Sequence, residues 1–214
     1  MRNSFLLIIL TLLCGLCLRA DPAATPAVYS NDFENAAVGK APEDLMILNG
    51  TFVVAQHAGN KFLELAPDPV DGDGLLFGPA DVTAGEVTAR IWAAASGRRF
   101  PEFGIGSNDA GGYKLIVLPA LGVIELHQGD DTKASAPFVW KSETWTKLRL
   151  RVSKGEGGKW KVQGKAWPQG TAEPGDWAVS FDDPQAPPAG RASTWGTPYS
   201  GKPIRFDDLS VRRF

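Results

Sequence analysis

Cysteine is almost absent from this chain of 214 residues, and both copies, Cys14 and Cys17, lie inside an apolar run near its start. If that run is a leader that is removed, no thiol remains in the rest of the protein. The absence excludes a disulfide framework, a zinc site with cysteine ligands and a cysteine nucleophile. The two histidines, His57 and His127, stand too far apart in the sequence to form a metal-ligand motif, and His57 has the neighbours of a surface turn.

Helical periodicity is also missing, and the 24 glycines and 16 prolines are spread through the whole chain. Short runs rich in β-branched and aromatic residues instead alternate with Gly, Pro, Asn and Asp. This pattern predicts an all-β protein, an antiparallel β-sandwich of the jelly-roll type. The runs that we expect to form strands are residues 28–33, 51–55, 61–66, 75–78, 86–93, 103–106, 113–118, 123–127, 144–152, 159–167, 177–181 and 204–211.

A long apolar segment occurs once, at residues 5–18 after Arg2, and it is shorter than the roughly 20 residues that span a bilayer. We interpret residues 1–20 as a secretory signal peptide, with a cut after Ala20 or within residues 23–27. Residues 21–27 are then a short linker, and residues 28–214 form a single β-sandwich domain. Leu16, which precedes Cys17, is larger than the residue that lipoprotein signals favour. The mature protein is predicted to be secreted or periplasmic, with no membrane span.

No basic cluster is present. Without Arg2 and Arg19, the chain has 20 basic and 24 acidic residues, a net charge of −4. This balance and its even distribution argue against nucleic acid as a partner. Nothing in the sequence indicates the oligomeric state.

Three of the expected strands, residues 86–93, 144–152 and 159–167, alternate apolar and polar side chains. If they are neighbours, their polar rows place tryptophans and cations on one sheet face. That face is either a solvated surface whose tryptophans pack under loops, or part of a ligand-binding surface. The polar rows consist of Glu86, Thr88, Arg90 and Trp92, then Trp145, Lys147, Arg149 and Arg151, then Lys159, Lys161, Gln163, Lys165 and Trp167.

Several segments together resemble the concanavalin A-like lectin/glucanase superfamily, and within it the laminin-G-like and 3-keto-disaccharide hydrolase-like domains of secreted bacterial proteins. The resemblance implies a β-sandwich, and described members include glycan binders and sugar-processing enzymes. It covers nearly the whole chain after the leader. The segments are SNDFENAAVGKAP at 30–42, NGTFVV at 49–54, WTKLRLRV at 145–152, KAWPQGTAEPGDWAVSFDD at 165–183 and IRFDDLSVRR at 204–213.

The same resemblance implies that the first and last strands are neighbours and that structural calcium binds at the seam between them. Asp32 and Glu34 would then meet Asp207 and Asp208. Carboxylates and turn carbonyls are the oxygen ligands that Ca²⁺ prefers. The alternative is that these acids are solvated residues of turns and strand ends.

Signals of catalysis are few. Sandwich glucanases carry a Glu-x-Asp-x-x-Glu-type motif, which is absent here. Glu125 and His127 lie two residues apart, so they project from the same strand face and could act as an acid and base pair. The alternative is an exposed polar row.

The leading hypothesis is a lectin-like domain that binds a glycan or polysaccharide on a concave sheet face without catalysis. Sugars stack on aromatic rings, while polar side chains bond their hydroxyl groups. One alternative is a glycosidase-like or 3-keto-disaccharide hydrolase-like enzyme that uses Glu125 and His127, and another is a structural or protein-interaction module of the cell envelope. The predicted ligand-binding residues are Arg90, Trp92, Tyr113, Glu125, His127 and Trp195.

Overall fold

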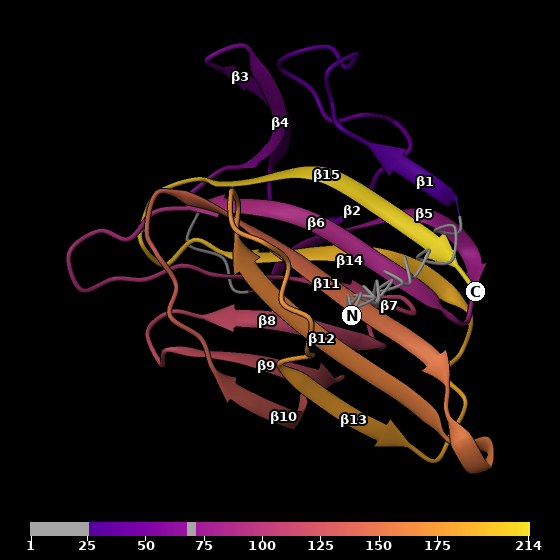
Figure 1. The fold of residues 1–214 in the computed structure, drawn as a ribbon. Coiled ribbons are helices and arrows are strands. Elements are labelled where there is room, and N and C mark those ends of the chain that lie inside the picture. The colour runs from indigo at the N-terminus through magenta and orange to yellow at the C-terminus, as the bar shows by residue number, and fades with distance from the viewer. Residues whose placement is uncertain (1–25, 68–71) are drawn as a thin grey trace, which may run out of the picture.

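The computed structural model describes residues 26–67 and 72–214, and nearly all of their regular structure is β-strand (Figure 1). A 3₁₀ turn, η1 (Glu156–Gly158), connects two long strands. The strands are β1 (Ala27–Asn31), β2 (Met46–Asn49), β3 (Phe52–His57), β4 (Asn60–Leu65), β5 (Asp73–Val82), β6 (Gly85–Ala93), β7 (Glu102–Ser107), β8 (Tyr113–Leu118), β9 (Val123–Gln128), β10 (Asp131–Pro137), β11 (Thr144–Lys154), β12 (Trp160–Pro168), β13 (Val179–Asp183), β14 (Gly190–Thr197) and β15 (Ile204–Arg213).

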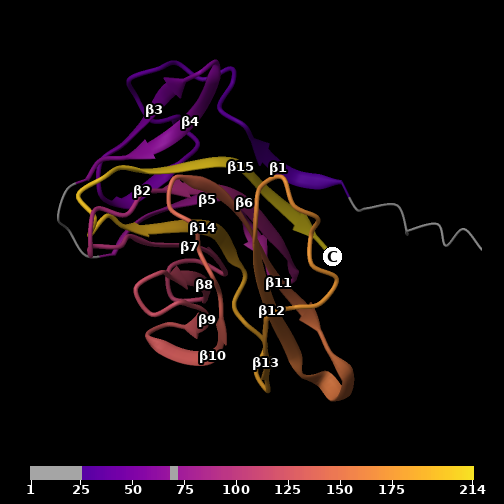
Figure 2. The same ribbon diagram turned by 60° about the vertical axis from the view of Figure 1, so that its left-hand side comes forward.

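The strands form two antiparallel sheets that pack face to face (Figures 1 and 2). Sheet A has the order β13-β12-β11-β6-β15-β4-β3, with β1 paired to β15. Sheet B has the order β10-β9-β8-β7-β14-β5-β2. The predicted all-β antiparallel sandwich is confirmed.

The core follows from the alternation of side chains along the strands. Leu148, Leu150 and Val152 of β11 face inward and are fully buried, as are Leu115 and Leu126 from sheet B. Burial of such side chains stabilises the fold by about 1.5–3 kcal/mol each. The alternation predicted for the strands at 86–93 and 144–152 is confirmed.

The two sheets approach each other closely where β12 crosses β8. A Cβ added at Gly164 of β12 would lie 2.3 Å from Cδ1 of Leu115. Only a residue without a side chain fits at this approach.

The prediction missed three strands, β2, β10 and β14, and placed β13 two residues too early. β14 has the sequence GRASTWGT, which carries few large apolar residues. It nevertheless lies inside sheet B, because it bonds β5 on one side and β7 on the other. Backbone pairing with two neighbours, which composition does not reveal, holds this strand in place.

β15 joins the first strand to the rest of the sheet, as the resemblance implied. One of its edges pairs with β6, and the other pairs with β4 and then with β1. The register of β15 against β6 shifts between Asp207 and Ser210. At this point the partner on the other edge of β15 changes from β4 to β1. Asp208, at the shift, has a left-handed φ of 51°.

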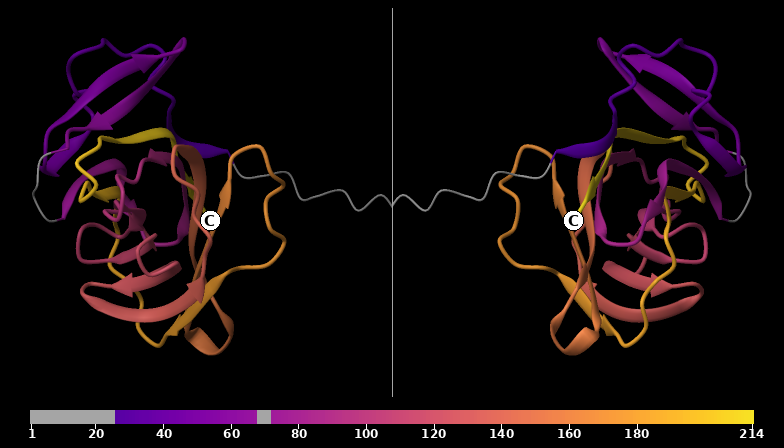
Figure 3. Two further views of the ribbon diagram at one scale, coloured as in Figure 1. Left: turned by 90° about the vertical axis from the view of Figure 1, so that its left-hand side faces the viewer. Right: turned by 90° about the vertical axis from the view of Figure 1, so that its right-hand side faces the viewer.

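The segment between β12 and β13, residues 169–178, stands against the outer side of sheet A, and we call it the arm (Figure 3). Glu173 of the arm forms ion pairs with Arg149 at 3.0 Å and Lys165 at 2.7 Å. Trp177 lies under the cations of Arg151 and Lys165. Part of the polar face of sheet A is therefore covered by a loop, which is the first of the two interpretations given above.

The predicted leader, residues 1–20, lies outside the described residues. Among the residues that are described, no helix has the length and apolar character needed to cross a membrane.

Candidate functional site

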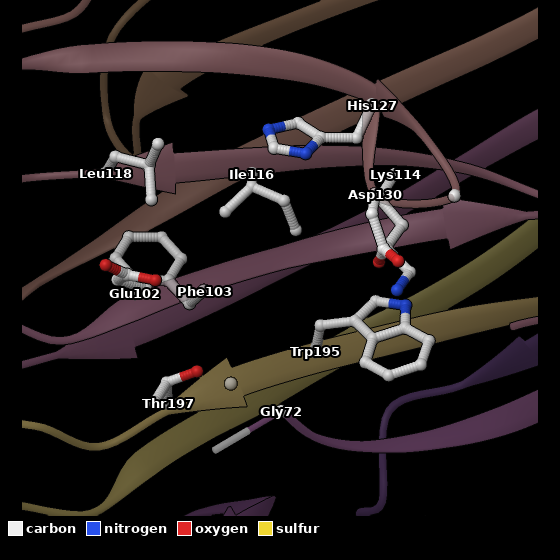
Figure 4. Close-up of a pocket in the computed structure, with 12 residues that line it drawn as sticks. Gly72, Glu102, Phe103, Lys114, Ile116, Leu118, His127, Asp130, Trp195 and Thr197 are labelled. Atoms are coloured by element: carbon white, nitrogen blue, oxygen red, sulfur yellow. The ribbon is translucent and has the colours of Figure 1, made fainter. Parts of the chain in front are cut away.

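A cavity of about 250 Å³ opens on the outer face of sheet B, where β9, β8, β7 and β14 run side by side (Figure 4). The strand register aligns its residues in rows across the sheet. Trp195 of β14 lies opposite Gly104 of β7, which lies opposite Ile116 of β8. The lining residues are Gly72, Glu102, Phe103, Lys114, Ile116, Leu118, His127, Gly129, Asp130, Trp195, Gly196 and Thr197.

Trp195 can lie flat against the sheet because its cross-strand neighbours have no side chains. A Cβ at Gly74 would come within 2.6 Å of the indole carbon Cε3, and one at Gly106 within 3.2 Å of Nε1. The indole N–H donates a hydrogen bond of 2.8 Å to Oγ of Ser193. The ring is therefore fixed as a flat aromatic surface beside the cavity.

Lys114 places its ammonium group over this ring, with Nζ 3.8 Å from the ring centroid. Within residues 26–67 and 72–214, no carboxylate lies within ion-pair distance of Nζ. Burial lowers the pKa of Lys114, and the negative charge of Asp130 partly opposes this shift. Figure 4 shows Lys114 and Asp130 together at one end of the indole.

The other wall of the cavity is aliphatic. Ile116 and Leu118 project from β8, and Thr197 and Glu102 supply polar groups at the opposite margin (Figure 4). The cavity thus combines a flat aromatic ring, an aliphatic wall and hydrogen-bonding groups at its edges. Sites for small polar ligands have this combination.

Glu125 and His127 project from the same face of β9, as predicted from their spacing. Nε2 of His127 lies 2.9 Å from Oε2 of Glu125. The hydroxyl groups of Thr132 and Ser135 on β10 also donate to this carboxylate, each at 3.3 Å. His127 lines the cavity. Glu125 is not among the lining residues and contacts the imidazole ring of His127 through its carboxylate.

The six residues predicted to bind a ligand do not form one surface. Glu125, His127 and Trp195 share the outer face of sheet B, whereas Arg90 and Trp92 lie on the outer face of sheet A. The cause is the connection from β6 to β7, which carries the chain from one sheet to the other. On sheet A, Trp92 is covered by the guanidinium of Arg205 at 4.4 Å.

Tyr113, the sixth residue, points into the core with only 1% of its surface exposed. Its hydroxyl donates a 2.6 Å hydrogen bond to Oδ2 of Asp183, and burial raises the pKa of the Tyr113 phenol. Burial alone would raise the pKa of Asp183 as well. The hydrogen bonds from Tyr113, the Gln185 backbone N–H and Gln128, with the charge of Lys133, outweigh burial and hold that pKa below 3.8.

We expect Tyr113→Phe to destabilise the protein at pH 7 by about 1.5–3 kcal/mol, because it removes a buried hydrogen bond to a charged group. Asp183 has a lowered pKa in the folded state, so its ionised form stabilises the fold above its unfolded pKa. This contribution is lost as the pH falls through the folded pKa. The loss caused by the substitution should therefore be largest at neutral pH and smaller in acid.

Urea unfolding of both proteins at pH 7 and at about pH 3 measures this difference. Tyr29→Phe is the matched control, because Tyr29 bonds Asp44 at 2.7 Å in an exposed position and should cost less. An equal loss for both variants, independent of pH, would argue against the assigned role of Tyr113.

The four acids proposed for calcium do not gather into one ligand set. In the described part of the chain, no three His, Cys, Asp or Glu side chains form a group that could hold a metal ion. Asp207 receives hydrogen bonds from Asn60 and Arg90. Oε1 of Glu34 accepts the Lys61 backbone N–H, and Oδ1 of Asp32 accepts that of Glu34. These acids accept hydrogen bonds from protein groups, so as arranged they do not form a set of calcium ligands. Calcium binding stays a prediction.

Sequence reasoning missed much of the cavity. Lys114, Ile116 and Leu118 are the alternate residues of one predicted strand, so their common face was readable. Which neighbours they would meet depends on β14, which was not predicted. The glycines beside Trp195 gave no signal of their own.

Comparison with protein-family models gave no match, and comparison with curated protein sequences gave none either. Comparison with solved structures shows the class of fold. An apo Crh5 transglycosylase aligns with a TM-score of 0.58 and 13% identity, over 88% of this chain and 85% of that one. A PL-14 alginate lyase from Aplysia kurodai aligns with a TM-score of 0.57 and 11% identity, over 88% and 100%.

The carbohydrate-binding module CBM66 from Bacillus subtilis aligns with a TM-score of 0.53 and 13% identity, over 79% of this chain and 95% of that module. At these identities the similarity shows the fold alone. The fold is a β-sandwich like those of the carbohydrate-binding module, the transglycosylase, the alginate lyase and a Bacillus subtilis protein with a galectin-like fold.

Proposed function

We propose that this protein binds a carbohydrate in the cavity on the outer face of sheet B. A sugar would stack on the Trp195 ring once the Lys114 ammonium group, which lies over that ring, turns aside to bond a sugar hydroxyl. The observation that carries the proposal is the placement of the indole, flat over Gly74 and Gly106 and beside an open cavity. A sugar presents an apolar face of C–H groups and a rim of hydroxyls. An aromatic ring matches the first and polar side chains match the second.

The charges around the cavity favour a neutral sugar. Lys114 is close to Asp130, and Glu102 lies at the opposite margin, so no excess of positive charge faces the ligand. Lys114, His127 and Thr197 are placed to bond hydroxyl groups. The similarity in fold to the module CBM66 and to the Crh5 transglycosylase supports a carbohydrate ligand in general. Following the predicted leader, we place this activity in a secreted or periplasmic protein.

A glycan array followed by calorimetric titration tests the proposal. We expect the native protein to bind at least one neutral oligosaccharide, with an affinity that changes little between low and high salt, because the ligand carries no charge. Absence of binding to every neutral glycan on a broad array would contradict the proposal.

An enzyme is the second candidate, and the pairing of Glu125 with His127 at the cavity favours it. Glu125 would orient the imidazole, and His127 would transfer a proton to or from a bound sugar. In that case His127→Asn should lower turnover by about 100-fold or more, while binding beside Trp195 persists. Product release from native and 3-keto disaccharides is the measurement. If the native protein releases no product in a long incubation, the enzyme candidate fails and binding alone remains.

A further inference from the structure

A second cavity lies on the opposite side of the sandwich, on the outer face of sheet A. It has a volume of about 160 Å³ and sits over β6, β11 and β12, which are adjacent in Figure 1. Three cations, Arg90, Lys147 and Arg149, line it together with the indole of Trp167. Two carboxylates, Glu173 and Asp208, also line it.

Lys147 occupies the centre of this row. In the strand register it lies opposite Arg90 of β6 on one side and Trp167 of β12 on the other. Its two cationic neighbours are paired, Arg90 with Asp207 at 2.6 Å and Arg149 with Glu86 at 2.6 Å. Among the residues that the structure describes, Lys147 itself has no ion pair and no side-chain hydrogen bond.

The ion pairs around Lys147 join four cations to four carboxylates and so balance in charge, and Lys147 adds one further positive charge. The cations are Arg90, Lys147, Arg149, Arg151 and Lys165, and the carboxylates are Glu86, Glu173, Asp207 and Asp208.

The arm shows how this face holds a carboxylate. Glu173 bridges Arg149 and Lys165 with one oxygen on each. Lys147 lies two residues before Arg149 on the same face of β11. Its ammonium group could also pair with a carboxylate, but no described residue supplies one. An anionic group supplied from outside would complete the row.

The cavity continues into a second hollow of about 410 Å³ along β1 and β15, since Thr88 and Asp208 line both. Hydroxyl, amide and carboxylate groups surround this second part, from Ser30, Asn31, Asp32 and Ser210. Such groups bond sugar hydroxyls. Arg212 lines this part as well and opposes the charge of Asp32. The groove therefore pairs one anion position with a length of polar surface.

We propose that the groove on the outer face of sheet A binds an acidic saccharide, one that carries a carboxylate or sulfate group, and that Lys147 pairs with this group. The site is separate from the cavity beside Trp195. Its ligand differs in charge, so the two sites can be tested one at a time.

The test titrates the full-length protein with a uronic acid oligosaccharide, with a sulfated oligosaccharide, with a neutral oligosaccharide of equal length and with inorganic sulfate. We expect Lys147→Met to weaken binding of an acidic oligosaccharide about tenfold or more, as loss of a charged hydrogen bond does. Raising the salt concentration should weaken the same binding in the native protein. Neutral-glycan binding beside Trp195 should not change.

Lys161→Met is the matched control, because Lys161 is an exposed lysine on β12 of the same sheet and the variant has the same net charge. Lys147→Arg keeps the charge and should retain most of the binding. Stronger binding of the uronate or of the sulfated sugar identifies the anion. Equal losses for Lys147→Met and Lys161→Met, or binding of acidic sugars no tighter than that of neutral sugars or inorganic sulfate, would overturn the proposal.

Discussion

Trp195→Ala is expected to weaken binding of a neutral glycan about 30-fold or more. The other aromatic residue of the cavity lining, Phe103, is fully buried, so the indole is the aromatic anchor that a ligand can reach. Truncating such an anchor commonly costs about 2 kcal/mol or more. The side chain also covers the backbone at Gly74 and Gly106, so its removal leaves a hollow where the sugar would stack. Trp195→Phe keeps a smaller ring and should lose less. Calorimetric titration with the best neutral glycan of the array measures both.

Trp92→Ala is the matched control, since Trp92 is also a partly exposed tryptophan on an outer sheet face, but on sheet A. It should leave neutral-glycan binding unchanged. Circular dichroism establishes that both alanine variants fold. If Trp92→Ala lost binding and Trp195→Ala kept it, the functional surface would be the other sheet.

The largest effect on stability is expected at Glu86, whose side chain is 2% exposed. Its carboxylate pairs with Arg149 at 2.6 Å and with Arg151 at 2.7 Å. Removing one partner of a buried pair costs about 3–5 kcal/mol. Because the two arginines are 21% and 37% exposed, we expect Glu86→Gln to cost about 3 kcal/mol, near the lower limit.

For a protein of this size, such a loss lowers the melting temperature by about 6–12 °C, which calorimetry measures. Glu64→Gln is the comparison, because the pair of Glu64 with Arg205, at 2.9 Å, is partly exposed on both sides. We expect it to cost less than about 1 kcal/mol. Similar losses for the two variants would show that burial does not set the strength of these pairs.

The fold was predictable because alternation along a strand reports burial directly. Leu148 and Leu150 alternate with Lys147, Arg149 and Arg151, and only one pleated arrangement buries the two leucines. The neighbours of each strand were harder to predict. β14 has small residues and two glycines, and its place in the middle of sheet B follows from backbone hydrogen bonds with strands that are distant in the sequence.

The candidate site was predicted in part for the same reason. Glu125 and His127 share a face by their spacing alone, and the structure places them together. Trp195 joins them only because β14, β7, β8 and β9 are adjacent in sheet B. Tyr113 illustrates the opposite case, since its phenol is a good sugar-binding group by type but faces inward to Asp183. Whether a side chain points into the core or away from it depends on the register of its strand in the sheet. The sequence of one strand leaves both directions open.

The most direct test of the central claim is an NMR titration that follows the indole N–H signals of the tryptophans as a neutral glycan is added. Assignment of Trp195 by its loss in Trp195→Phe identifies the relevant signal. Stacking of the sugar on Trp195 predicts that its signal shifts on binding while those of Trp92 and Trp145, on sheet A, stay in place. Shifts at Trp92 or Trp145 with an unmoved Trp195 signal would contradict it.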